Sequence, residues 1–190
     1  TNKTGSVSPD VNKPAYRAVS FDELKDAYYE QVTGLAEGGV DLILIETIFD
    51  TLNAKAALFA VQEYNEKHHT NIPVMVSGTI TDASGRTFSG QTLEAFYNSM
   101  AHADLLSIGL NCSFGAEQLK EPIERFSNIS RFYISAHPNA GLPDEFGDYK
   151  QSAQEMAQHV RSYMEDGLVN IIGGCCGSRP EHIEAIATVA

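Results

Sequence analysis

The chain is 190 residues long, and its 25 acidic residues outnumber its 13 Lys and Arg residues, which gives a formal net charge of −12. That length suits one domain with a sizeable core, and the negative charge argues against nucleic-acid binding, which requires clustered Lys and Arg. No apolar run approaches the roughly 20 residues that span a bilayer, and the N-terminus lacks the layout of a signal peptide, so we expect a cytoplasmic protein without membrane contact.

The chain opens with a predicted loop and a predicted helix. Residues 1–19 are polar, rich in turn-forming residues and without periodicity, which predicts a leading loop. Ser20 and Glu23 then form the S-x-x-E pattern of a capping box, a signature of a helix N-terminus. Apolar residues follow at helical spacing until Gly38 and Gly39, where we expect the helix to end.

Five short apolar runs follow, and each predicts a buried strand. They recur about every 32 residues, and segments with a periodicity of about 3.6 residues separate them. Strands that are apolar on both faces and alternate with amphipathic helices are typical of a parallel α/β sheet. A second capping box at Ser152 and Glu155, and Pro180 in a first turn, predict the last two helices. The apolar runs are residues 42–45, 74–76, 105–108, 132–134 and 169–172.

Two architectures accommodate five such units. One is an open, doubly wound sheet, and the other is a TIM (β/α)₈ barrel, whose eight units need about 250 residues. The chain begins with a loop rather than with a strand, which favours the barrel. We therefore expect residues 1–190 to be the C-terminal part of a barrel, with about five β/α units present and the first three strands missing.

All three cysteines follow apolar runs, at the strand ends where parallel α/β folds place reactive groups. Cys112 follows the third run, and the adjacent Cys175 and Cys176 follow the fifth. Neighbouring side chains in a regular strand point to opposite faces, but the glycines around the pair free the backbone to turn there, so that two thiolates can converge. Three thiolates with an open fourth position describe a catalytic zinc site, and soft sulfur donors select zinc over magnesium or calcium.

Other interpretations of these residues stay open. A cysteine after a barrel strand is commonly a small buried hydrophobic residue, and the adjacent pair is also consistent with a vicinal disulfide. His137 is a candidate fourth ligand for a closed, structural zinc site in a docking module, yet the segment that it begins is equally consistent with a tight turn. Glu46 ends the first apolar run, where a carboxylate is costly unless paired. It therefore either binds a cationic group, such as a substrate ammonium, or forms a salt bridge between strands.

Residues 109–112 and 173–177 resemble the two zinc-binding motifs of the homocysteine S-methyltransferase family. Further segments resemble the cobalamin-dependent members of that family, and the resemblance runs along nearly the whole chain. Agreement over several long segments is much more specific than three cysteines alone. The further segments are residues 41–56, 77–86, 89–98 and 136–143.

The resemblance implies a TIM (β/α)₈ barrel in which Cys112, Cys175 and Cys176 hold Zn²⁺ and the sulfur of homocysteine takes the fourth position. It implies that Glu46 contacts the amino group of the substrate. The implied activity is methyl transfer to homocysteine, which gives methionine. The implied methyl donor is methylcobalamin, carried by a cobalamin-binding domain of the same parent chain and recharged by a folate-binding domain.

The family's opening strands, with the glycine-rich loop expected to hold the substrate carboxylate, do not appear in this sequence. The resemblance therefore implies that residues 1–190 alone are inactive. Two alternatives to the activity remain at this point. One is a different homocysteine or thiol S-methyltransferase, and the other is a zinc-free α/β barrel for phosphate or aldol chemistry, in which the cysteines are incidental.

Overall fold

The fold follows from the alternation of strand and helix along the chain. The computed structural model describes residues 4–81 and 84–190, so residues 1–3 of the leading loop and residues 82–83 of the segment 77–86 lie outside the described residues. The strands are β1 (Ile43–Ile48), β2 (Val74–Gly78), β3 (Ser107–Gly115), β4 (Tyr133–Asn139) and β5 (Ile171–Ile172). The helices are α1 (Phe21–Glu37), α2 (Thr51–His68), α3 (Leu93–Met100), α4 (Ala116–Ile129), α5 (Ala153–Glu165) and α6 (Pro180–Val189).

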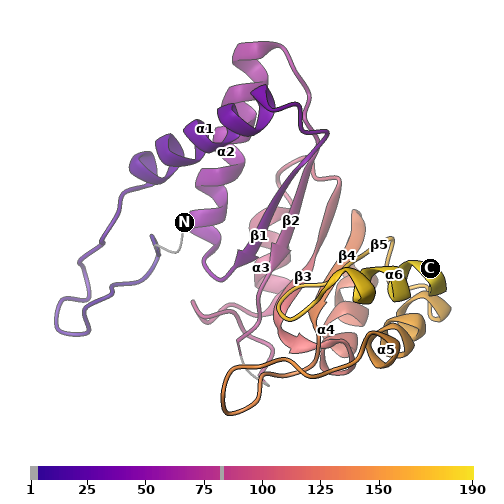
Figure 1. The fold of residues 1–190 in the computed structure, drawn as a ribbon. Helices are drawn as coiled ribbons and strands as arrows, with labels where there is room; N and C mark the ends of the chain where they lie inside the picture. Colours follow the sequence, from indigo (N-terminus) through magenta and orange to yellow (C-terminus); the bar gives the residue numbers. More distant parts are fainter. Residues whose placement is uncertain (1–3, 82–83) are drawn as a thin grey trace.

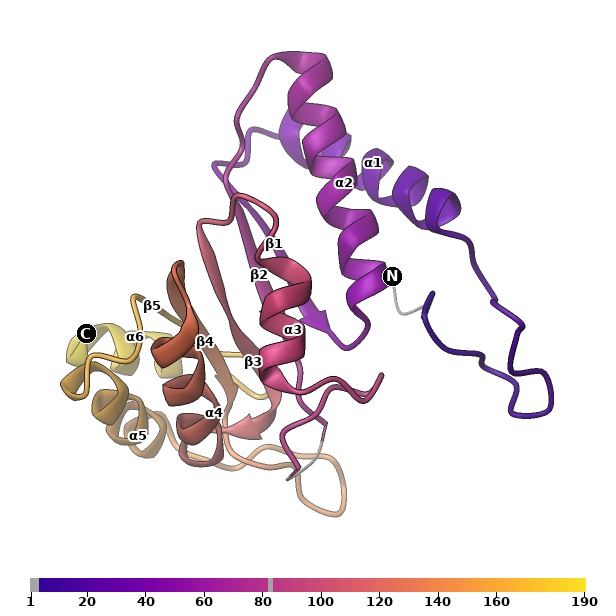
Figure 2. The same ribbon diagram turned by 180° about the vertical axis from the view of Figure 1, so that it is seen from behind.

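The prediction of a parallel α/β fold is confirmed. The described strands form one sheet in the order β1-β2-β3-β4-β5, and every neighbouring pair is parallel (Figure 1). A doubly wound sheet reverses its strand order and carries helices on both faces, so that alternative is wrong. Strands added in one direction through right-handed crossovers place their helices on one face, and α2, α3 and α4 lie in front of the strands in Figure 2.

The sheet is not closed. Its first and last strands, β1 and β5, do not pair with each other in the part of the chain that the structure describes. The expected barrel is therefore not confirmed by the structure, although a continuous strand order without reversal is the order that a barrel requires. No helix among the described residues is both long enough and apolar enough to cross a membrane.

Two of the strands extend well beyond the apolar runs that predicted them. The run at 105–108 predicted the third strand, whereas β3 continues through Asn111 and Cys112 to Gly115. Likewise, β4 includes His137, so the tight turn expected to begin there is wrong. Backbone hydrogen bonds to a neighbouring strand hold a polar residue as well as an apolar one, and hydrophobicity alone therefore underestimates strand length.

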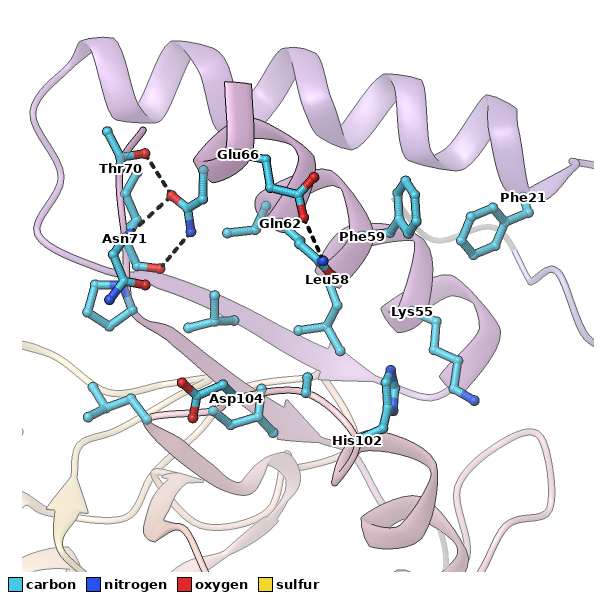
Figure 3. A pocket seen from close by; sticks show the side chains of 18 residues that line it. Phe21, Lys55, Leu58, Phe59, Gln62, Glu66, Thr70, Asn71, His102 and Asp104 are labelled. Carbon is cyan, nitrogen blue, oxygen red and sulfur yellow. Dashed lines mark hydrogen bonds between the residues drawn. The ribbon is translucent and has the colours of Figure 1, made fainter. Parts of the chain in front are cut away.

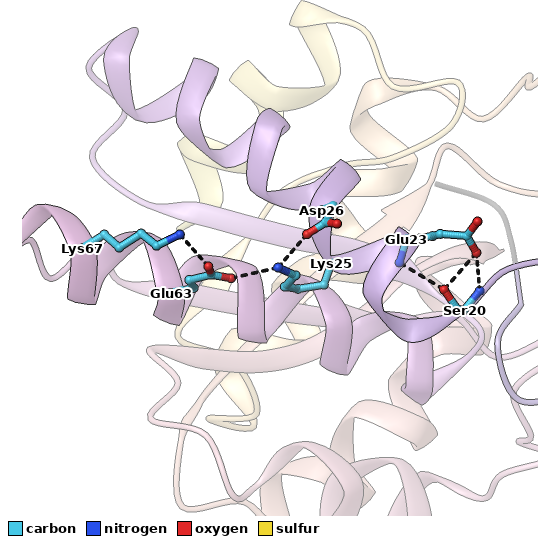
Figure 4. A network of polar contacts seen from close by, with 6 residues as sticks. All are labelled: Ser20, Glu23, Lys25, Asp26, Glu63 and Lys67. Carbon is cyan, nitrogen blue, oxygen red and sulfur yellow. Dashed lines mark hydrogen bonds and ion pairs between the residues drawn. The ribbon is translucent and has the colours of Figure 1, made fainter.

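Helix α1 begins with the predicted capping box, and its Lys25 forms an ion pair with Glu63 of α2 (Figure 4). The backbone N–H of Glu23 donates to Ser20 Oγ at 3.2 Å, and the N–H of Ser20 donates to the Glu23 carboxylate at 2.8 Å. On α2, the Glu63 carboxylate lies 3.2 Å from Lys25 Nζ and 2.6 Å from Lys67 Nζ. Partly exposed ion pairs contribute at most about 1 kcal/mol each, so apolar packing is the larger contribution to this contact.

The buried side chains between the sheet and the helices form the core. Phe96 of α3 and Phe126 of α4 are fully buried, with ring centroids 6.0 Å apart. Strands β3 and β4 pack tightly at Gly109, where an added Cβ would lie 1.8 Å from the carbonyl oxygen of Ser135 in β4. Glycine at this position therefore sets the spacing of β3 and β4 directly below the cysteine-bearing edge.

We expect Gly109→Ala to lower the free energy of unfolding by about 1–3 kcal/mol, because overpacking forces the two strands apart. The matched control is Gly34→Ala on α1, where an added Cβ meets nothing within 4 Å. That substitution should raise the free energy of unfolding by about 0.5–1 kcal/mol, since alanine is the better helix former. Urea unfolding measures both changes, and equal stability of the two variants would contradict the close approach at Gly109.

Candidate metal centre

The three cysteines come together at the carboxyl edge of the sheet. Their Sγ atoms all lie within 4.8 Å of one another, and the Sγ atoms of Cys112 and Cys176 are 3.5 Å apart. All three are free thiols, so the structure contains no vicinal disulfide between Cys175 and Cys176. Within residues 4–81 and 84–190, no other group of three His, Cys, Asp or Glu side chains is close enough to share an ion, and His137 is not a member of this one.

A strained stretch of backbone directs Cys112. Cys112 and Ser113 have φ values of +64° and +60°, in the left-handed region that non-glycine residues seldom adopt. The pairing of β3 with β4 shifts register between Asn111 and Gly115, which marks a bulge. A bulge takes a side chain out of the regular alternation of the strand, and here it brings the first thiol to the edge where the other two lie.

Hydrogen bonds from β4 and the residue after it hold the cysteine pair where β5 has ended. The N–H of Cys175 donates to the carbonyl of Pro138 at 2.8 Å. The N–H of Cys176 donates to Asn139 Oδ1 at 3.0 Å, and the carbonyl of Cys176 accepts from the N–H of Ala140 at 2.9 Å. These hydrogen bonds continue the contact between the C-terminal segment and β4 beyond the end of β5, and they fix both cysteines relative to β4.

Gly177 and Tyr149 close the turn after the pair. Gly177 has φ +76°, and an added Cβ would lie 2.2 Å from the Cβ of Tyr149. Burial raises the pKa of Tyr149, and the charges of Cys176, Cys112 and Cys175 raise it further. Tyr149 therefore remains a neutral phenol beside the sulfurs.

The donor set fits a divalent, thiophilic ion. Burial raises the pKa of the Cys175 thiol to about 11, a hydrogen bond from Asn111 lowers it, and the charges of Cys112 and Cys176 raise it again. Without a cation, Cys175 therefore keeps its proton at neutral pH. A bound metal ion removes this penalty, because it deprotonates a coordinating thiol. Three sulfur ligands are a soft donor set, which suits Zn²⁺.

Glu46 and His137 flank the cysteines on other strands. Glu46 is exposed near the end of β1. The next residue, Thr47, has a φ of +56°, and both residues lie where the pairing of β1 with β2 shifts register between Ile45 and Ile48. The described residues form no ion pair with Glu46, so the structure does not show the expected alternative of a salt bridge. Burial lowers the pKa of His137, the charge of Glu46 opposes this, and His137 Nδ1 is buried without a hydrogen-bond partner in the described structure.

Two residues of the site were missed by sequence reasoning. Asn111 is fully buried and Tyr149 is partly buried, and both contact the cysteine-bearing segments. The signal for Asn111 was an asparagine inside a strand that is otherwise apolar, since a buried amide is costly unless it is hydrogen-bonded. Tyr149 gave no such signal, because it lies in a long loop between β4 and α5 whose path only the structure shows.

A cavity of about 870 Å³ lies away from this edge (Figure 3). Its wall includes Phe59 and Gln62 of α2 and His102 and Asp104 before β3. This wall lies mainly between α2 and the segments that lead into β2 and β3, and it contains none of the three cysteines. The cavity is therefore separate from the candidate metal centre.

The fold and the site together define a parallel α/β domain with a candidate three-thiolate metal centre. The chain belongs to the homocysteine S-methyltransferase family, whose sequence profile matches residues 1–190. Its fold is similar to two crystal structures of the homocysteine methyltransferase MmuM from Escherichia coli. The apo form gives a TM-score of 0.69 over 90% of this chain, and the metallated form gives 0.71 over 93%, both at 18% sequence identity. The chain spans 58% and 54% of the length of those two chains.

We expect His137 to make the stability of the metal-free protein sensitive to acid. Because burial holds the pKa of folded His137 below its ordinary value of about 6.5, the unfolded state binds more protons. The free energy of unfolding should therefore fall as the pH falls through about 6.5, and His137→Gln should remove part of this loss. Unfolding measurements from about pH 7 to pH 5 test this, with exposed His102→Gln as the control. An unchanged pH slope in His137→Gln would assign the loss to other groups.

Proposed function

We propose that the protein binds Zn²⁺ and activates homocysteine for methyl transfer, as part of a cobalamin-dependent methionine synthase (5-methyltetrahydrofolate–homocysteine methyltransferase, EC 2.1.1.13). The convergence of Cys112, Cys175 and Cys176 at one edge carries the proposal. Membership of the homocysteine S-methyltransferase family supports both the reaction class and homocysteine as the methyl acceptor.

In this proposal the three cysteines are the metal ligands, and the fourth position is left for the substrate thiol. When bound, Zn²⁺ supplies the Lewis acidity that favours the thiolate form of a bound thiol at neutral pH. The three protein thiolates outnumber the two positive charges of the ion, so the centre stays net negative. That excess of negative charge keeps a bound sulfur nucleophilic. His137 is not part of the sulfur cluster, which supports an open site over a closed structural one.

Glu46 is the proposed partner of the substrate ammonium group. Its carboxylate is exposed on β1, at the same edge of the sheet as the cysteines. The next residue, Thr47, is hydrogen-bonded to Asn111, whose amide in turn reaches Cys175. An amino-acid thiol held through its sulfur at the cysteines therefore has an acidic group nearby on a neighbouring part of the edge.

We further propose that the domain is the C-terminal part of a TIM (β/α)₈ barrel. Two observations support this: the chain spans little more than half of the MmuM chains, and the outer edges of β1 and β5 are unpaired within the described sheet. The barrel would then be completed by three further strands that carry the rest of the substrate pocket. Residues 1–190 alone would bind metal but transfer no methyl group.

The proposed methyl donor is methylcobalamin, held by a cobalamin-binding domain and recharged by a folate-binding domain of a cytoplasmic parent protein. The segments 41–56, 77–86, 89–98 and 136–143 support this choice, because they resemble the cobalamin-dependent members of the family. A second candidate is a homocysteine or thiol S-methyltransferase that uses a different donor, and family membership favours it equally. Turnover of the parent protein with methylcobalamin as the only methyl source distinguishes the two.

The metal centre is tested by replacing its ligands one at a time. We expect Cys112→Ala, Cys175→Ala and Cys176→Ala each to abolish stoichiometric zinc, because the remaining two thiolates do not complete a tight site. Elemental analysis of the purified variants measures the loss, with Ser127→Ala on α4 as the control. A variant that retains its zinc would remove that cysteine from the ligand set, and a metal-free wild-type protein would favour the zinc-free barrel.

The substrate contact is tested at Glu46. We expect Glu46→Gln to weaken homocysteine binding by about 10–100-fold with zinc retained, because a hydrogen bond to a charged group contributes about 1.5–3 kcal/mol. Calorimetric titration of homocysteine into the zinc-loaded parent protein measures the affinity, and Glu37→Gln on α1 is the matched control. Unaltered affinity in Glu46→Gln would rule out the ammonium contact.

A further inference from the structure

The buried side chain of Asn111 in β3 is hydrogen-bonded to β1, to β2 and to Cys175 of the cysteine pair. Its Oδ1 accepts hydrogen bonds from the backbone N–H of Thr47 at 2.9 Å and from the hydroxyl of Ser77 at 2.7 Å. Its Nδ2 donates to Thr47 Oγ1 at 2.9 Å and to Cys175 Sγ at 3.7 Å. The amide thus connects β1, β2 and the turn after β5 within a single group.

These partners fix which way the amide points. The backbone N–H of Thr47 can only donate, so the amide atom that faces it must be the oxygen. The –NH₂ group then faces Thr47 Oγ1 and the sulfur of Cys175, both of which can accept. A flipped amide would place two donors face to face and an oxygen against the sulfur. The backbone N–H of Thr47 therefore determines the orientation of the Asn111 amide.

We propose that Asn111 is a positioning residue that orients the Cys175 thiolate toward the metal ion and fixes the Glu46 segment of β1 against the same centre. The inference rests on the proposed function, in which Cys175 is a metal ligand. An N–H···S hydrogen bond holds the sulfur in one orientation and stabilises its negative charge. The same amide makes two hydrogen bonds to Thr47, whose positive φ needs such support from its surroundings.

No other side chain of this size meets both demands at position 111. Aspartate keeps the acceptor for Thr47 and Ser77, but it turns a carboxylate oxygen toward the thiolate, and two negative charges repel each other. Leucine is similar in size but removes the acceptor of the Thr47 N–H and leaves the hydroxyl of fully buried Ser77 without its acceptor. The acceptor is needed on the β1 and β2 side, and the donor is needed on the sulfur side.

The test is Asn111→Asp in the purified protein, loaded either with Zn²⁺ or with Co²⁺ as a spectroscopic substitute. We expect zinc affinity, measured by competition with a chelator, to fall by about 10–100-fold, as is typical when a residue behind a metal ligand is changed. We also expect the thiolate-to-cobalt charge-transfer band to shift, because one sulfur has lost its N–H donor. A purely structural role would leave the band of the folded variant unmoved.

The matched control is Asn65→Asp near the end of α2, where Oδ1 accepts from the N–H of Ile72 at 3.1 Å and from Thr70 Oγ1 at 2.8 Å. It makes the same chemical change outside the sulfur cluster and should alter neither the zinc affinity nor the charge-transfer band. Should Asn111→Asp not fold, Thr47→Val takes its place, since it keeps the backbone N–H but removes the hydroxyl that accepts from Asn111 Nδ2. We expect a smaller change in the same direction, because the amide is then held by fewer hydrogen bonds.

The outcomes separate the two proposals. A wild-type protein that binds neither Zn²⁺ nor Co²⁺ would overturn the proposed function and, with it, the role of Asn111. A wild-type protein that binds both ions, together with Asn111→Asp or Thr47→Val showing wild-type affinity and an unmoved band, would overturn the role of Asn111 alone.

Discussion

Parallel pairing of β3, β4 and β5 is the constraint on which the site depends. Cys112 and Cys176 are 64 positions apart, yet Cys112 lies in β3 and Cys176 follows β5. Both strands are hydrogen-bonded to β4, so both thiols reach the same edge of the sheet. The pairing at Gly109 is tight enough to leave no room for a side chain between β3 and β4. The distance between the sulfurs is therefore set by the backbone spacing of the sheet, which the buried core maintains.

Local strain is concentrated at this edge. Within the described residues, three of the four non-glycine residues with positive φ, namely Thr47, Cys112 and Ser113, lie at the ends of β1 and β3. Each costs about 1–3 kcal/mol and persists only where its surroundings determine it. Buried Asn111 supplies that support at Thr47 through two hydrogen bonds, and buried Asn139 holds the N–H of Cys176 at the same edge. Sharp turns in the backbone and amide hydrogen bonds thus replace regular pairing where the strands end.

Hydrophobic pattern and capping chemistry predicted the elements well, because both act over a few residues. The capping boxes at Ser20 and Ser152 are confirmed, and so is the parallel α/β fold. The pattern missed the extension of β3 through Asn111 and Cys112, because strand pairing depends on a distant partner and not on local hydrophobicity. The pattern correctly predicted three cysteines at one edge of the sheet. It could not predict which way the Asn111 amide points, because that direction is set by the backbone N–H of Thr47 in β1, which is remote in sequence.

The shortness of β5 has a consequence for how the chain holds its C-terminal segment. Two residues, Ile171 and Ile172, make the ladder to β4, and the cysteine pair comes directly after them. An ion shared by Cys112, Cys175 and Cys176 would act as a cross-link that spans β4 and staples the last strand to the middle of the sheet. The C-terminal segment would then detach from the sheet more slowly with metal bound than without it. Chelation would therefore loosen the C-terminal end before the rest of the sheet.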